Sequence, residues 1–131
     1  MGAFNNYLED KIVEHFLRNN ATTPPATVYV GLFESDPGEA NAGTETAFVN
    51  YARQSATWTA LDANGQTKNA ATLTFPANGN PAASVTITHL CLFDAATAGN
   101  RLLHAALSAP KTLSPGDVLS CATNAVVFGL D

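Results

Sequence analysis

Residues 84–107 constrain the fold of this chain more than any other stretch, because they combine two apolar runs with a tight turn. The turn sequence DAATAGN ends in Gly99 and Asn100, which tolerate the positive φ angles of a chain reversal. Apolar residues fall on both strand faces from Leu90 onward. The stretch therefore predicts a β-hairpin in the middle of a sheet, covered on both sides.

Strict alternation divides the first strand of this hairpin between two faces. One face is predicted to carry Val85, Ile87, His89, Cys91 and Phe93, and the other Thr86, Thr88, Leu90 and Leu92.

Further strands are predicted on both sides of the hairpin, because strand-forming runs alternate with turn signals. Asn64-Gly65 and Pro115-Gly116 are the clearest of these signals. Roughly seven or eight short strands at close intervals are typical of an antiparallel β-sandwich or jelly roll. The predicted fold is mainly β, a jelly-roll-like sandwich with one N-terminal helix, and residues 1–131 are expected to form one domain. The predicted strands outside the hairpin cover residues 27–33, 51–61, 67–75, 118–121 and 124–130.

The N-terminal helix is predicted over about residues 4–18. Apolar residues at positions 4, 8, 12 and 16 recur with helical spacing, and Tyr7, Val13 and Leu17 widen the stripe. Asn5 or Asn6 can cap its start, Asn19 and Asn20 offer a stop, and the prolines at 24 and 25 guarantee one. Two interpretations stay open: the helix packs on its own sheet, or it docks on a partner. The aromatic residues Phe4 and Tyr7 are the candidate interface residues of the second interpretation.

The longest predicted loop, residues 34–48, is acidic. It carries four of the eleven acidic residues of the chain. The spacing does not match the calcium-binding loop of an EF-hand, so a solvated loop ordered by a neighbouring subunit is the preferred interpretation. Its acidic residues complete the candidate partner interface: Glu34, Asp36, Glu39 and Glu45.

Composition excludes some classes of partner. The net charge is −5, and the six basic residues are scattered, which argues against a nucleic-acid partner. No apolar run is long enough to span a bilayer, and the N-terminus lacks the features of a signal peptide. Synthesis in a reducing cytoplasm is therefore expected, with Cys91 and Cys121 as small buried apolar residues. A disulfide would require their two strands to be neighbours.

The sequence predicts no enzyme. His89, Cys91 and His104 form a superficial metal-binding set, but the spacing is weak, and histidines between neighbouring strands are the preferred interpretation. His89 and His104 are expected to face each other across the hairpin. The chain contains no nucleophile elbow, phosphate-binding loop or zinc-protease motif. No catalytic, cofactor-binding or metal-binding residue is therefore predicted.

A collinear set of segments resembles a known group of proteins. The segments are NNYLEDKIVEHFLRN, TPPATVYVGLF, SDPGEA, NYARQ, TFP, ITHLCLFDAATAGNRLLHAAL and PKTLSPGDVL. Together they resemble small virion structural proteins of tailed bacteriophages, usually labelled phage tail-fibre protein. The chain departs from that group at Cys91, where a small or β-branched residue is expected, and in a less glycine-rich acidic loop.

The resemblance implies a non-enzymatic virion component, made in the host bacterial cytoplasm, that binds other virion proteins and forms a homo-oligomer. The small size, the absence of repeats and the low content of charged residues, 13%, favour a capsid decoration (cement) protein bound to the major capsid protein. The alternative is a tail-fibre or tail-associated protein involved in host attachment. A further alternative is a carbohydrate-binding β-sandwich module, with Trp58, Tyr51 or Tyr29 as an exposed aromatic platform.

Overall fold

The computed structural model describes residues 2–129, which form one helix and a set of antiparallel strands. The N-terminal part contains β1 (Ala3–Phe4), α1 (Asn6–Leu17), β2 (Val28–Phe33) and β3 (Gln54–Ala56). The short strands β4 (Gln66–Lys68) and β5 (Leu73–Thr74) follow. The long strands β6 (Val85–Phe93) and β7 (Arg101–Leu113) come next, and β8 (Ser120–Cys121) and β9 (Val127–Gly129) close the described chain.

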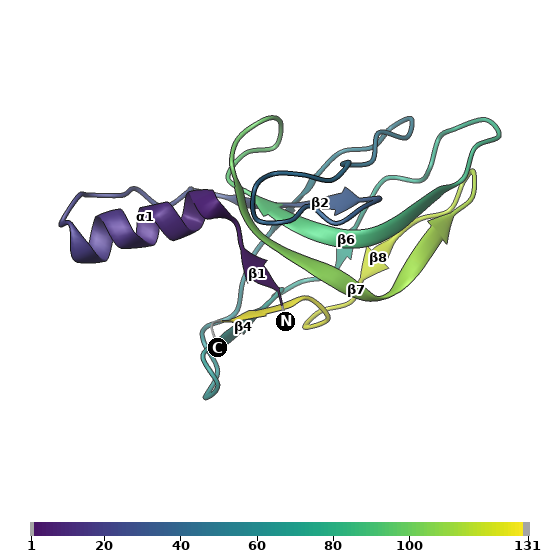
Figure 1. The fold of residues 1–131 in the computed structure, drawn as a ribbon. Coiled ribbons are helices and arrows are strands. Elements are labelled where there is room, and N and C mark those ends of the chain that lie inside the picture. The colour runs from purple at the N-terminus through teal and green to yellow at the C-terminus, as the bar shows by residue number, and fades with distance from the viewer. Residues whose placement is uncertain (1, 130–131) are drawn as a thin grey trace.

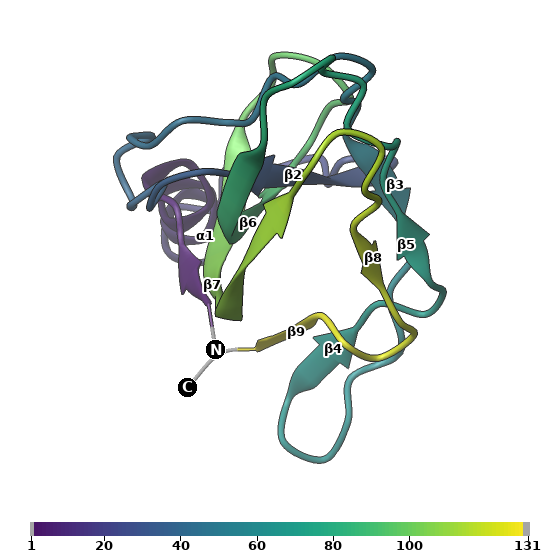
Figure 2. The same ribbon diagram turned by 90° about the vertical axis from the view of Figure 1, so that its right-hand side faces the viewer.

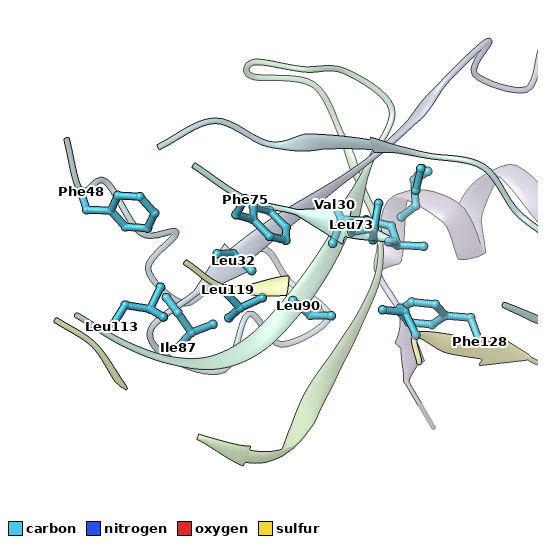
Figure 3. Packing of buried hydrophobic residues seen from close by; sticks show 14 residues of the cluster. Val30, Leu32, Phe48, Leu73, Phe75, Ile87, Leu90, Leu113, Leu119 and Phe128 are labelled. Carbon is cyan, nitrogen blue, oxygen red and sulfur yellow. The ribbon is translucent and has the colours of Figure 1, made fainter. Parts of the chain in front are cut away.

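The strands form a sandwich. Five of them make one antiparallel sheet in the order β1-β7-β6-β2-β3, and the pairs β4-β9 and β5-β8 lie opposite it (Figure 2). The main core fills the space between, with Phe75, Leu32, Ile87 and Phe128 among its most buried side chains (Figure 3). The predicted β-sandwich with one N-terminal helix is confirmed, and the jelly-roll topology stays a prediction.

The hairpin of residues 84–107 occupies the position that its sequence predicts. β6 lies between β7 and β2 and has core clusters on both of its faces. Gly99 has a φ of +72° in the turn, and Ala98, rather than Asn100, is the second residue with a positive φ.

The predicted division of β6 into faces is wrong for half of the strand. A β-bulge between Ile87 and His89 shifts the register by three residues, because the partner on β7 moves from Lys111 to Ala106 while β6 advances by two. Ile87 therefore lies in the main core with Leu90 and Leu92, whereas Cys91 and Phe93 lie in a second cluster on the other face. Strict alternation cannot show this irregularity, which reverses the side of the β6 side chains after it.

The predicted strands 51–61 and 67–75 are each divided into short pieces. Gly65 has the expected positive φ in the turn, and Trp58 and Asn69 form a bridge across the hairpin stem. The backbone N–H of Ala70 still donates to the carbonyl of Thr57 in this stem, and the buried Asn69 side chain donates hydrogen bonds to the carbonyls of Ala71 and Ala122. β4, just before Asn69, pairs with β9. Leu130, the predicted end of the last strand, lies outside the described residues.

Both cysteines are free, and they lie on opposite faces of the large sheet. Cys91 is buried between Phe33 and Phe93 in the second cluster, and Cys121 packs partly buried against the main core. Burial raises the pKa of the Cys91 thiol to about 12 and also raises the pKa of Cys121. Both groups are therefore protonated, poorly reactive thiols at neutral pH.

We expect the free energy of unfolding to fall as the pH rises above about 9. The unfolded Cys91 thiol loses its proton near its usual pKa of 9.0, whereas the folded thiol keeps it up to about 12. The folded state then binds more protons than the unfolded state, so stability decreases between these two values. Urea unfolding from pH 8 to 11 measures this slope. The variant Cys91→Ala should show a flatter slope, and an unchanged slope would contradict this account.

Candidate partner interface

Helix α1 projects from the edge of the large sheet as an arm (Figure 1). None of its twelve residues is buried. Tyr7 and Leu8, near its base, pack partly against the main core, whereas Phe16 and Leu17 at its far end are 75% and 79% exposed. The predicted amphipathic helix is therefore confirmed as a helix, and only its base packs on the protein's own core.

The chain after α1 returns alongside the helix and leaves a groove of about 440 Å³ between them. Leu8, Ile12 and Phe16 line it from the helix, and Pro24 and Pro25 line it from the returning segment. The prolines thus form the opposite wall of this groove, whereas the helix ends before them at Leu17, and Asn19 follows with a positive φ of 55°.

The outer face of α1 forms a stripe, defined here as Asn6, Glu9, Asp10, Val13, Phe16 and Leu17, and all six residues are exposed. The spacing of three and four residues places them on one side of the helix. The base of the stripe is acidic and its tip is apolar. The two basic side chains of the arm lie elsewhere: Arg18 pairs with Glu14, and the Lys11 ammonium lies 5.5 Å from the centre of the Tyr7 ring.

Asn5 fixes the base of the arm to the sheet. Its side chain is fully buried and donates hydrogen bonds to the carbonyls of Gly38 (2.8 Å) and Glu39 (3.3 Å). Its Oδ1 lies 3.0 Å from Nδ1 of the buried His104 on β7, so this nitrogen carries the proton that is donated. Asn5 is the N-cap residue, as predicted, but its side chain makes no capping hydrogen bond.

The predicted start of the helix at residue 4 is wrong for a related reason. Phe4 belongs to β1, which pairs with β7, and Phe4 itself lies opposite Leu103. The backbone N–H of Asn5 continues this contact by donating to the carbonyl of Leu102. The chain is therefore held as a strand until Asn5, and α1 begins only at Asn6.

The acidic loop lies against the second face of the sheet and touches the base of the arm. The carbonyl of Glu39 accepts a hydrogen bond from the backbone N–H of Asn6, and the Glu39 side chain is exposed. Asp36 accepts a hydrogen bond from the Gly38 N–H, and its carboxylate lies 3.8 Å from Nε2 of His89. Glu34 accepts a hydrogen bond from the Thr46 hydroxyl.

Glu45, the fourth acidic residue of the predicted interface, points inward. Both of its carboxylate oxygens accept hydrogen bonds from the Arg53 guanidinium, at 2.8 Å each. Gly31 makes room for this pair, because a Cβ there would lie 3.0 Å from Glu45 Oε1 and 2.8 Å from the Phe93 ring. Glu45 is therefore part of the internal support of the sheet.

The predicted interface residues of the helix are less exposed than its tip. Phe4 is half-buried at an apolar groove of about 320 Å³, which it shares with Trp58, Leu61 and Phe128. Tyr7 is half-buried at the base of the arm. The exposed apolar tip, Phe16 and Leu17, was assigned to the core-facing stripe because periodicity gives the face of a helix but does not say what covers it.

The three aromatic residues proposed as a sugar-binding platform have separate settings. The Tyr51 hydroxyl accepts a hydrogen bond from the Leu32 N–H and donates one to Glu45, and its pKa is raised by burial and by the nearby Glu45 charge. Trp58 packs edge-on against Phe128. Tyr29 packs against the second cluster. The described positions of these rings therefore do not form one exposed row.

The register of the hairpin places two residues of the superficial metal set, Cys91 and His104, opposite each other and leaves His89 apart from them. His104 pairs with Cys91, and His89 pairs with Ala106, so the predicted pairing of the two histidines is wrong. Within residues 2–129, no group of three His, Cys, Asp or Glu side chains is arranged to hold a metal ion. The described chain also contains no helix of the length and apolarity that a membrane span requires.

Comparison with known protein families gives a match over nearly the whole described chain. The family model described as Podophage GP4 fiber I protein gp80 matches residues 3–129. The chain belongs to this family. No curated protein matches the sequence.

The family match confirms the resemblance to phage virion structural proteins of the tail-fibre type. This fibre protein is thus a component of a phage particle.

Proposed function

We propose that this protein is a non-enzymatic structural subunit of a phage fibre that joins neighbouring virion chains and contributes to host attachment. The observation that carries the proposal is the fibre-family match over residues 3–129. It favours the tail-fibre alternative over the capsid decoration that size and composition favoured. The exposed tip of α1 supports a connecting role, because an apolar helix end of this kind is stabilised when a partner covers it.

The hydrogen bonds of the charged side chains inside the protein also support a structural role. Arg53 donates to Glu45 and to the carbonyls of Ala95 and Ala98, so its hydrogen bonds stabilise loops. Among the described residues, no buried side-chain nitrogen or oxygen lacks a hydrogen-bond partner. These groups hold the protein's own loops and sheet together, as expected of a structural subunit made in the host cytoplasm.

A cryo-electron microscopy reconstruction of the intact particle tests the proposal. We expect density for this chain at the fibres. Density repeated over the capsid shell would instead establish capsid decoration, and absence of the chain from purified particles would contradict a virion role. The same reconstruction gives the number of copies and therefore tests the expected homo-oligomer.

A further inference from the structure

We propose that the outer stripe of α1 docks into a different virion chain, on a surface that has an apolar hollow with lysine or arginine side chains at its rim. This inference rests on the proposed function, because it names the surface through which the fibre subunit is attached and the chemistry of its partner.

The tip of the stripe supplies the apolar part of the contact. Val13, Phe16 and Leu17 are 47%, 75% and 79% exposed, and they lie on one side of the last turns of the helix. Three large apolar side chains on an arm that extends from the protein form a compact anchor, which a hollow in a partner can surround completely. Phe16 also borders the groove behind the helix, but all three side chains are exposed.

The base of the stripe supplies the charge. Glu9 and Asp10 lie on the same side of the helix as the tip, two helical turns and about 10 Å away along the helix axis. Both carboxylates are exposed, and the exposed Glu39 lies at the start of the stripe, where its backbone carbonyl accepts a hydrogen bond from Asn6. The stripe carries no lysine or arginine, and each basic residue of the arm has a neighbour on another side of the helix.

This charge pattern disfavours a second copy of the same chain as the occupant. Two stripes in parallel would place Glu9 and Asp10 of one copy against the same acidic residues of the other. Two stripes in antiparallel arrangement would bury these carboxylates against Phe16 and Leu17. The first arrangement is repulsive and the second desolvates charges without partners, whereas a basic rim on a different chain satisfies them.

Site-specific photo-crosslinking in assembled particles tests the inference. Benzoylphenylalanine replaces Leu17 in the full chain, which is supplied to phage that lack their own copy of the gene. Irradiation should link position 17 to a peptide of a different virion protein. Benzoylphenylalanine in place of Val118, which is 49% exposed before β8, is the control and should not give this product.

Two paired variants measure the apolar and charged contributions. Phe16→Ser with Leu17→Ser should reduce the copies per particle about tenfold or more, as expected for loss of an apolar anchor. Glu9→Gln with Asp10→Asn should reduce them about threefold at low salt and less at high salt. Ala63→Lys with Ala70→Lys changes the net charge equally, at exposed sites on the distant hairpin, and should have no effect.

The outcomes separate this inference from the proposed function. The inference would be overturned if position 17 crosslinked to this same chain or to a host envelope protein alone. It would also be overturned if position 17 gave no crosslink in particles that contain the chain. Each of these outcomes would leave the virion role intact. Equal incorporation of the Glu9→Gln, Asp10→Asn pair and the wild type would also overturn it, because the basic rim would be unnecessary. Complete absence of the wild-type chain from particles would overturn the virion role itself.

Discussion

Replacing Arg53 by Met is expected to lower the free energy of unfolding by about 3 kcal/mol, because it leaves the Glu45 carboxylate without its partner. The guanidinium binds both Glu45 oxygens at 2.8 Å and lies 3.3 Å from the centre of the Phe93 ring. It also donates to the carbonyls of Ala95 and Ala98, in the turn between β6 and β7. One side chain therefore joins the acidic loop, the sheet and the central hairpin turn.

The electrostatic part of this network has a definite direction. Burial lowers the pKa of Arg53, but the hydrogen bonds and charge of Glu45 outweigh burial and raise it above its usual value. The Arg53 guanidinium is therefore charged in the folded protein. The Arg53 side chain is only 8% exposed, so in the Arg53→Met variant water cannot readily replace the hydrogen bonds that Glu45 loses.

A matched substitution separates this effect from the loss of any arginine. Arg18→Met removes the partner of Glu14 on the exposed side of α1, and we expect a loss of at most about 0.5 kcal/mol. Urea unfolding followed by circular dichroism measures both variants. A cost for Arg53→Met as small as that for Arg18→Met would show that the Glu45 network contributes little to stability.

Local sequence signals predicted the elements that depend on neighbouring residues. The central hairpin, the Asn64-Gly65 turn and the helix all follow from periodicity and from residues with a known turn preference, and each is present. Gly116 likewise has the positive φ that the Pro115-Gly116 turn requires. These features could be predicted because the interactions that define them lie within a few residues of each other.

The features that the sequence did not reveal depend on distant contacts. The bulge after Ile87 changes the face of every later β6 residue, and no residue type marks it. Glu45 was taken as an exposed loop acid because its partners, Tyr51 and Arg53, lie in another segment of the chain. The buried asparagines at 5, 69 and 78 resembled ordinary turn residues, although their side chains bond to backbone groups up to 57 residues away.

A distant contact also explains why the sequence predicted helix α1 but not the direction in which it extends. The apolar stripe at positions 8, 12 and 16 is that of a helix lying on its own sheet. The helix instead leaves the sheet edge at Asn5, whose side chain is held by His104 and the acidic loop. The direction of the arm is thus set by a contact between residues 99 positions apart, which helical periodicity does not report.

Replacing Asn5 by Ala should release the arm and lower the free energy of unfolding by about 3 kcal/mol. The substitution removes the acceptor of the His104 Nδ1 proton and both donors to the carbonyls of Gly38 and Glu39. These groups surround a fully buried side chain, so they would lose their partners away from solvent.

Asn6→Ala is the control, since Asn6 is the same residue type one position later and is exposed. We expect its unfolding free energy to stay within about 0.5 kcal/mol of the wild type.

Hydrogen exchange should distinguish the two variants further. In Asn5→Ala, the amides of α1 and of residues 36–40 should exchange faster together, because Asn5 joins these two segments, while those of β6 keep their protection. Faster exchange in α1 alone would show that the arm and the acidic loop are held independently. The coupled loss would instead identify Asn5 as the residue that fixes the outer stripe of α1 in position beside Glu39, where both can meet one partner.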